Sequence, residues 1–188
     1  AMVERWIERL LDGGFDVLPH LVQPSAEASR MDMPEARQRW AEFAESAIAR
    51  FAGRVRHFEI GSTPNRHSWS GYTTADYATA ARIAQEIAER RGAKLIGPNT
   101  SDFAPYFTVA LMDACARAGA RFAAMSDNLF IDRAGAPEAY DPSVAGRALR
   151  GAIKMDLPRK SAALLAIARH FGVERVWSTY CYFTLALT

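Results

Sequence analysis

The segment from residue 61 to residue 72 concentrates side chains that could bind a ligand. Gly61 and Pro64 are turn-forming residues and interrupt the apolar run 55–60, so the segment is expected to be a loop that follows a strand. Its polar and aromatic members are Asn65, Arg66, His67, Ser68, Trp69, Ser70 and Tyr72. An aromatic ring can stack on a sugar, and the amide, guanidinium and imidazole groups can hydrogen-bond to its hydroxyls. The loop therefore predicts a carbohydrate site, with Thr63, Asn65, Trp69 and Tyr72 as contacts.

Glu59 lies in the apolar run just before this loop. Because side chains alternate along a strand, Glu59, Gly61 and Thr63 are predicted to share one face. Two interpretations of Glu59 remain open. It is either a buried carboxylate in a core hydrogen-bond network or a residue that contacts substrate directly, as a catalytic group or a ligand contact.

Polar residues also follow other predicted strands. Asp127 and Asn128 follow the run 121–125, Asn99 follows 93–97, and His20 lies near the end of 15–22. Asp127 is a candidate catalytic carboxylate, with a turn or capping role as the alternative. Asn99, Asn128 and His20 are predicted substrate contacts, and Asp102, just before a helix, is predicted to cap it.

The alternation of elements predicts a single α/β domain over residues 1–188 with a parallel sheet covered by helices. The predicted strands are 15–22, 55–60, 93–97, 121–125 and 173–183, and the predicted helices are 3–11, 33–51, 74–91, 105–118, 142–153 and 158–170. The helical stripes place Trp6, Trp40, Phe43, Ala47 and Phe51 in the core. Tyr180 and Tyr182, in the last strand, are predicted to line the pocket, and Cys115 and Cys181 to be buried thiols.

The composition and the motifs argue against several classes of function. The formal net charge of +2, without a basic stripe, argues against nucleic acid. No apolar run approaches the roughly 18 residues that span a bilayer, and the charged start does not resemble a signal peptide, so a cytoplasmic location is the default expectation. The sequence contains no dinucleotide-binding glycine motif, no Walker motif and no metal-ligand spacing, so no cofactor or metal is expected. It also lacks the Gly-x-Ser-x-Gly motif of serine hydrolases.

Two segments resemble clan A glycoside hydrolases, which are (β/α)8 barrels. Residues 58–65, Phe-Glu-Ile-Gly-Ser-Thr-Pro-Asn, are similar to the strand-four segment Trp-Glu-Ile-x-Asn-Glu-Pro-Asn. Thr63 stands at the general acid/base Glu of that pattern, and Ser62 at its Asn. Residues 177–182 are similar to the strand-seven segment Trp-x-Thr-Glu-aromatic-Gly: Trp177 and Thr179 match, but Tyr180 stands at the nucleophilic Glu.

The resemblance implies an incomplete or shortened TIM-barrel-like fold that contains strands three to seven. An open five-stranded sheet is the alternative that length favours, because a complete barrel typically has about 250 residues. Open sheet edges would favour a homo-oligomer or the remainder of a longer chain. Since both glutamates are replaced, the resemblance implies an oligosaccharide- or polysaccharide-binding protein linked to bacterial-type polysaccharide metabolism. An active glycosidase that uses the displaced carboxylates Asp127 and Glu59 is the alternative, so whether the protein is an enzyme stays open.

Overall fold

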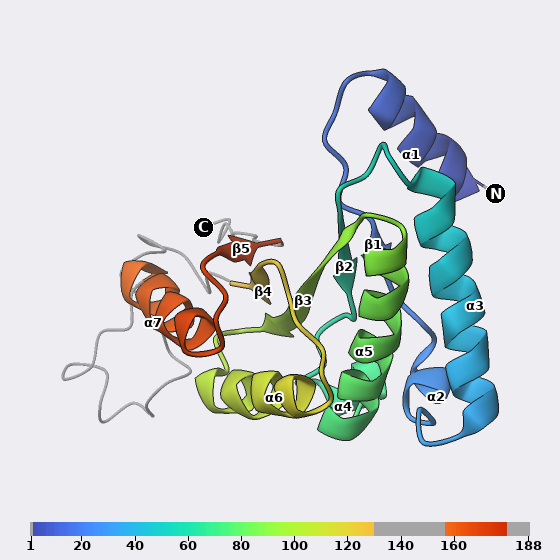
Figure 1. The fold of residues 1–188 in the computed structure, drawn as a ribbon. Helices are drawn as coiled ribbons and strands as arrows, with labels where there is room; N and C mark the ends of the chain where they lie inside the picture. Colours follow the sequence, from blue (N-terminus) through green and yellow to red (C-terminus); the bar gives the residue numbers. More distant parts are fainter. Residues whose placement is uncertain (1, 130–156, 180–188) are drawn as a thin grey trace, which may run out of the picture.

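The protein forms a parallel sheet that is covered by helices, as the sequence predicts. The computed structural model describes residues 2–129 and 157–179 (Figure 1). The strands pair in the order β1-β2-β3-β4-β5, all parallel. They are β1 (His20–Leu21), β2 (His57–Ile60), β3 (Lys94–Ser101), β4 (Met125–Asn128) and β5 (Val176–Ser178). The helices are α1 (Met2–Asp12), α2 (Ser25–Ala28), α3 (Pro34–Phe51), α4 (His67–Ser70), α5 (Thr74–Arg90), α6 (Pro105–Arg117) and α7 (Leu157–His170).

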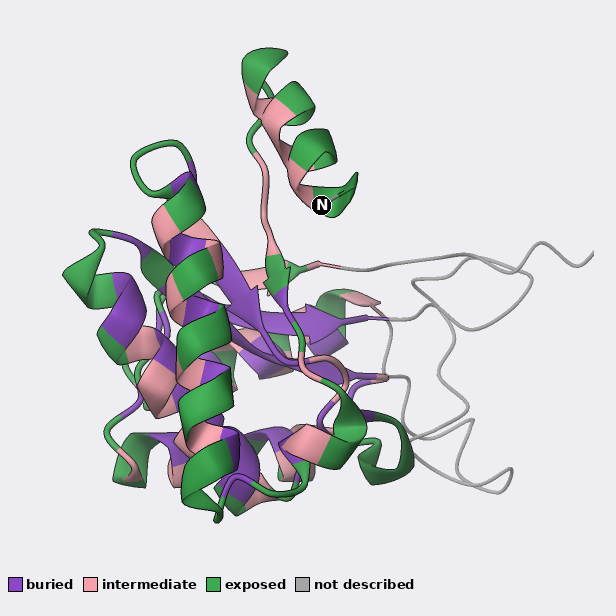
Figure 2. Ribbon diagram, turned by 90° about the vertical axis from the view of Figure 1, so that its right-hand side faces the viewer, coloured by how far each residue is buried: buried purple, intermediate pink, exposed green. Residues whose placement is uncertain are grey.

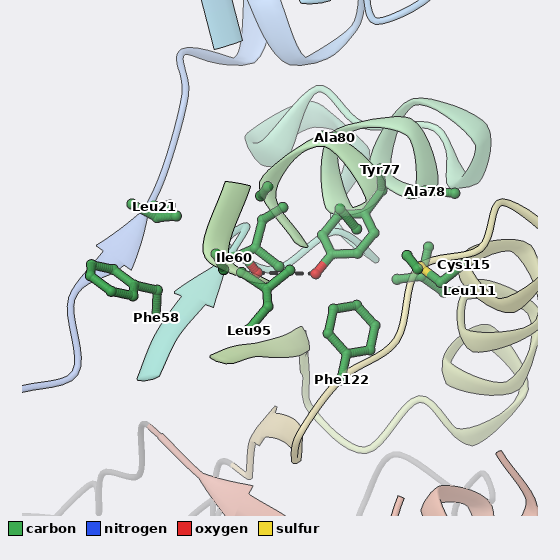
Figure 3. Close-up of a cluster of buried hydrophobic side chains, with 14 of the residues drawn as sticks. Leu21, Phe58, Ile60, Tyr77, Ala78, Ala80, Leu95, Leu111, Cys115 and Phe122 are labelled. Carbon is green, nitrogen blue, oxygen red and sulfur yellow. Dashed lines mark hydrogen bonds between the residues drawn. The ribbon is translucent and has the colours of Figure 1, made fainter. Parts of the chain in front are cut away.

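The core lies between the sheet and the helices α3, α5 and α6. Figure 3 shows Tyr77 of α5 among Leu95, Phe122 and other apolar side chains, with its hydroxyl donating to the Ile60 carbonyl at 3.0 Å. Gly61 follows at once with φ of 79°, and a Cβ there would lie 2.5 Å from the Tyr77 ring. The end of β2 therefore requires glycine, both for its backbone conformation and for its contact with Tyr77.

The helices begin and end where local chemistry favours it. Thr73 forms a capping box with Asp76 at the start of α5, which confirms the helix predicted from residue 74. Trp40 of α3 is buried and donates its indole N–H to the Ala80 carbonyl of α5 at 2.9 Å. This bond crosses from one helix to the next and satisfies the polar atom of a large core side chain.

Two core predictions for aromatic residues are wrong. Phe43 is exposed, because the buried stripe of α3 follows Ala36, Trp40, Ala44, Ile48 and Phe51 instead. Trp6 is 58% exposed, because α1 contacts the body through Ile7 and Leu11 on its other face. Figure 2 shows α1 at one end of the molecule with much of its surface exposed.

Strand positions differ from those predicted at three places. The predicted strand 15–22 pairs only at His20–Leu21, and β4 begins at Met125, where the strand predicted over 121–125 ends. β3 continues to Ser101, beyond the predicted end at residue 97, through a cis Gly97–Pro98 bond and a register shift between Pro98 and Thr100. The predicted helix 142–153 lies outside the described residues.

None of the described helices combines the length and the apolar character required to cross a membrane.

Candidate functional site

A cleft of about 1140 Å³ lies where the strands end at the carboxyl-terminal edge of the sheet. Parallel pairing puts these ends at one edge, which is where parallel α/β folds generally bind ligands. The lining residues come from all five strands or the loops that follow them. They are His20, Glu59, Ser62, Thr63, Asn65, Arg66, His67, Ser68, Trp69, Asn99, Ser101, Asp102, Asn128 and Thr179. Seven of the predicted site residues are in this set: His20, Glu59, Thr63, Asn65, Trp69, Asn99 and Asn128.

Glu59 lies at the floor of the cleft and is only 3% exposed. Its Oε1 accepts hydrogen bonds from Asn99 Nδ2 at 2.9 Å and from Thr179 Oγ1 at 2.8 Å. Its Oε2 lies 3.8 Å from His20 Nε2. These neighbours supply the polar partners that a buried carboxylate requires. Glu59 is thus part of a hydrogen-bond network, as the first interpretation has it, and it also lines the cleft, where direct contact with a substrate stays a prediction.

Asn99 connects the parts of this floor. Its Nδ2 lies 3.2 Å from Asn128 Oδ1 and 3.1 Å from Thr179 Oγ1, and its Oδ1 accepts from the Thr63 backbone N–H at 3.2 Å. The register shift in β3 places Asn99 at φ of 58°. Such irregularities redirect a side chain from one face of a sheet to the other. The bulge therefore explains why Asn99 reaches the cleft.

One wall of the cleft joins the loop after β2 to the end of β3. Asn65 Nδ2 donates to the Ser101 carbonyl at 2.7 Å, and Asn65 Oδ1 accepts from the Ser101 backbone N–H at 3.0 Å. Beside it, Arg66 forms an ion pair with Asp102. The predicted capping role of Asp102 is wrong, because α6 has Ala104 at its N-cap and Asp102 adopts φ of 62°.

The short helix α4 carries an aromatic side chain at the rim. Trp69 is 73% exposed and lines the cleft together with His67 and Ser68. His67 Nδ1 lies 2.9 Å from the Tyr72 carbonyl, which links the first residue of α4 to the chain just after the helix. A large exposed aromatic ring beside polar groups is a surface on which a flat ligand can stack.

Tyr72, predicted as a ligand contact, is instead buried in the core. Its ring lies edge-on to Tyr77 with centroids 5.2 Å apart, and its hydroxyl accepts from Gln23 Nε2 at 2.8 Å. Burial raises the pKa of this phenol. Gly71, with φ of 77°, reverses the chain after α4 and directs Tyr72 inward. Tyr72 thus follows Trp69 closely in the sequence, but its side chain points into the core and not into the cleft.

Asp127, predicted as a catalytic carboxylate, is fully buried and is not among the cleft residues. Its Oδ2 accepts from Thr100 Oγ1 at 2.6 Å, and Thr100 in turn contacts Thr108 of α6 at 3.1 Å. Strand alternation explains the error, since Asn128 faces the cleft and the preceding residue must face the helices. Burial raises the pKa of Asp127 to about 7, whereas the Thr100 hydrogen bond and the charge of Lys160 act in the opposite direction.

The other predictions fall into two groups. Tyr180, Tyr182 and Cys181 lie outside the described residues. Cys115 is a buried thiol as predicted, and burial raises its pKa to about 12. Among the described residues, no group of three or more His, Cys, Asp or Glu side chains is arranged to hold a metal ion.

Sequence reasoning missed Ser101 and Thr179 as members of the site, whereas Arg66 belongs to the polar loop that the sequence indicates. Ser101 was hidden because β3 is longer than its apolar run. Thr179 had a usable signal, since it matches the strand-seven pattern next to the replaced nucleophile, but only the structure shows its hydrogen bond to Glu59.

No protein-family model matches this sequence, and no match was found among curated proteins. Solved structures do match. One is a curdlan-specific exo-β-1,3-glucanase of family GH128 (subgroup III) from Blastomyces gilchristii in complex with glucose, with a TM-score of 0.61 and 19% identity. Another is a glucosidase from Croceicoccus marinus, with a TM-score of 0.58 and 15% identity.

The two matches cover 92% and 99% of this chain, but only 62% and 38% of the respective enzymes. The chain thus spans less than two thirds of either neighbour. Identities this low show the fold alone. The fold is that of clan A-like glycoside hydrolases, with a parallel β/α arrangement of the TIM-barrel type.

Proposed function

We propose that this chain binds an oligosaccharide, or a stretch of a polysaccharide, in the cleft and does not cleave it. The observation that carries the proposal is the exposed ring of Trp69 at the rim of a cleft whose other walls are almost entirely hydrogen-bonding side chains. Sugars present apolar C–H faces and hydroxyl edges. A stacking ring beside amides, hydroxyls and a carboxylate is complementary to both surfaces.

The floor and the wall are held in place by their own hydrogen bonds. Asn65 joins the two loops through two bonds to Ser101, and Asn99 joins Glu59, Asn128 and Thr179. Side chains that are already ordered lose little conformational entropy when a ligand binds. The site therefore supports recognition of a ligand without a large rearrangement of the described residues.

The same geometry argues against hydrolysis by the usual pair of carboxylates. Thr63 lines the cleft at the position where the resemblance expects the general acid/base, and a hydroxyl of ordinary acidity cannot protonate a glycosidic oxygen at neutral pH. Of the displaced carboxylates, Asp127 lies on the other face of the sheet. Within the described part of the chain, the carboxylates of the cleft are Glu59 and the Arg66-paired Asp102. We therefore favour binding, within the metabolism of a polysaccharide, over catalysis.

The test is a titration of neutral glucose and mannose oligosaccharides, including β-1,3-linked glucans because a β-1,3-glucanase shares the fold. Isothermal titration calorimetry measures binding, and mass spectrometry of the same mixtures detects cleavage. We expect Trp69→Ala to weaken binding by about tenfold or more, in keeping with loss of a stacked ring. Trp6→Ala is the matched control, because Trp6 is also exposed but lies on α1 outside the cleft.

Three outcomes separate the possibilities. Binding that Trp69→Ala removes and Trp6→Ala preserves, without products, supports the proposal. Products would show that the chain is a glycosidase. If no oligosaccharide of the panel binds, the proposed carbohydrate binding is refuted, while the fold is unaffected.

A further inference from the structure

Resting on the proposed carbohydrate binding, we infer that Glu59 makes the cleft selective for uncharged sugars by accepting a hydrogen bond from a ligand hydroxyl. The sequence presented this residue as a catalytic candidate. In the structure it lies at the floor of the cleft, and the described residues form hydrogen bonds with only one of its two carboxylate oxygens. This position suits a residue that determines which ligand binds.

The two oxygens of Glu59 have different surroundings. Oε1 receives hydrogen bonds from Asn99 and Thr179, and these fix the orientation of the carboxylate. Oε2 faces His20, whose Nε2 is 3.8 Å away, beyond hydrogen-bond length. Among the described residues, no hydrogen bond to Oε2 is formed. A sugar hydroxyl is a donor of the right size to meet this oxygen, and a donor paired with a carboxylate forms a strong hydrogen bond.

Charge in the cleft points to the same selectivity. Arg66 and Asp102 form an ion pair, so they offset each other at the wall. The remaining carboxylate of the described lining is Glu59, and His20 and His67 add positive charge only when protonated. At a pH where the histidines are neutral, the floor is negative. A uronate or sulfate group placed there would meet the Glu59 carboxylate, which is itself only 3% exposed.

The size of this repulsion decides whether selectivity is measurable. Two like charges about 6 Å apart at an effective dielectric constant of about 20 repel strongly enough to lower the affinity roughly a hundredfold. Salt and the open mouth of the cleft reduce this effect. We therefore expect at least about a tenfold preference for a neutral sugar over its acidic counterpart.

The experiment compares three neutral tetrasaccharides with the same tetrasaccharides oxidised to uronates at C6. They are β-1,3-linked glucose, β-1,4-linked glucose and β-1,4-linked mannose, titrated by calorimetry at pH 8 in low salt with the whole chain. The variants are Glu59→Gln, which keeps the shape and the acceptor for Asn99 and Thr179, and Glu42→Gln on the exposed face of α3 as a control with the same change in net charge.

We expect the wild type and Glu42→Gln to prefer the best neutral sugar by at least about tenfold, and Glu59→Gln to bring that ratio close to one. Circular dichroism checks that each variant is folded. If Glu59→Gln is unfolded, Glu59→Asp, which keeps the charge, should preserve the preference. An unchanged ratio in Glu59→Gln, or equal wild-type affinity for both forms, overturns this inference while carbohydrate binding stands. No binding by the wild type to any neutral sugar overturns the proposed function and this inference together.

Discussion

The buried carboxyl group of Asp127 should make the stability of the protein depend on pH. Asp127 is fully buried between β4 and the helices, and burial raises its pKa from 3.8 to about 7. The folded state therefore holds this proton more tightly than the unfolded chain does. As the pH rises above about 4, the unfolded chain releases the proton first, so the free energy of unfolding falls until about pH 7.

The magnitude follows from the difference between the two pKa values, which is about 3. At 1.36 kcal/mol for each pKa unit, the loss of stability between pH 4 and pH 8 amounts to about 4 kcal/mol, as an upper bound. Asp127→Asn removes the titration but retains an oxygen that accepts from Thr100 Oγ1. The difference in stability between the wild type and the variant should therefore change by up to that amount over the range.

Urea unfolding of both proteins at pH values from 4 to 8 measures this difference. Asp32→Asn, at an exposed position, is the control and should follow the wild type at every pH. The informative quantity is the slope, because the variant also leaves an amide N–H where Asp127 Oδ1 has no hydrogen-bond partner among the described residues. Parallel curves for the wild type and Asp127→Asn would refute the reasoning.

Two further substitutions test the fold that supports the site. Gly61→Ala should lower the free energy of unfolding by about 2 kcal/mol or more, because φ is 79° and the new Cβ would clash with the Tyr77 ring. Urea unfolding measures this change. A near-neutral result would contradict the close contact between residue 61 and Tyr77. Asn65→Ala should weaken oligosaccharide binding at least about fivefold by releasing Ser101 from its two hydrogen bonds. Asn65→Asp keeps only the acceptor, so its affinity should lie between those of the wild type and Asn65→Ala. Equal affinities of all three proteins in calorimetry would contradict the role of this wall.

The elements of the fold could be predicted because their signals are local. Thr73 with Asp76 marks the start of α5, and the apolar run before Gly61 marks β2. The alternation of the two element types then implies a parallel sheet. The length of β3 could not be predicted, because Pro98 and the polar residues after it lack the pattern of a buried strand, although pairing with β4 extends it to Ser101.

The candidate site was predictable to the extent that it lies at strand ends. His20, Glu59, Asn99 and Asn128 all lie at the cleft because parallel pairing brings those ends together. It was harder to predict whether each side chain points into the cleft or into the core. Asp127 points away from the cleft because it lies within β4, one residue before the cleft-facing Asn128, and Tyr72 points inward because Gly71 reverses the chain. A difference of one residue moves a strand side chain to the other face, and propensity does not determine it.

The bulge in β3 connects the two polar regions of the protein. Asn99 joins Glu59 and Asn128 in the cleft, and its neighbour Thr100 donates to Asp127 on the helix-facing side. β4 shows the same division, since Asn128 belongs to the cleft and Asp127 to the buried cluster. Without the register shift, regular alternation along β3 would place Asn99 on the helix-facing side and Thr100 toward the cleft. The polar residues of the strand ends are thus divided between a cleft that can meet a ligand and an interior cluster whose stability we expect to depend on pH.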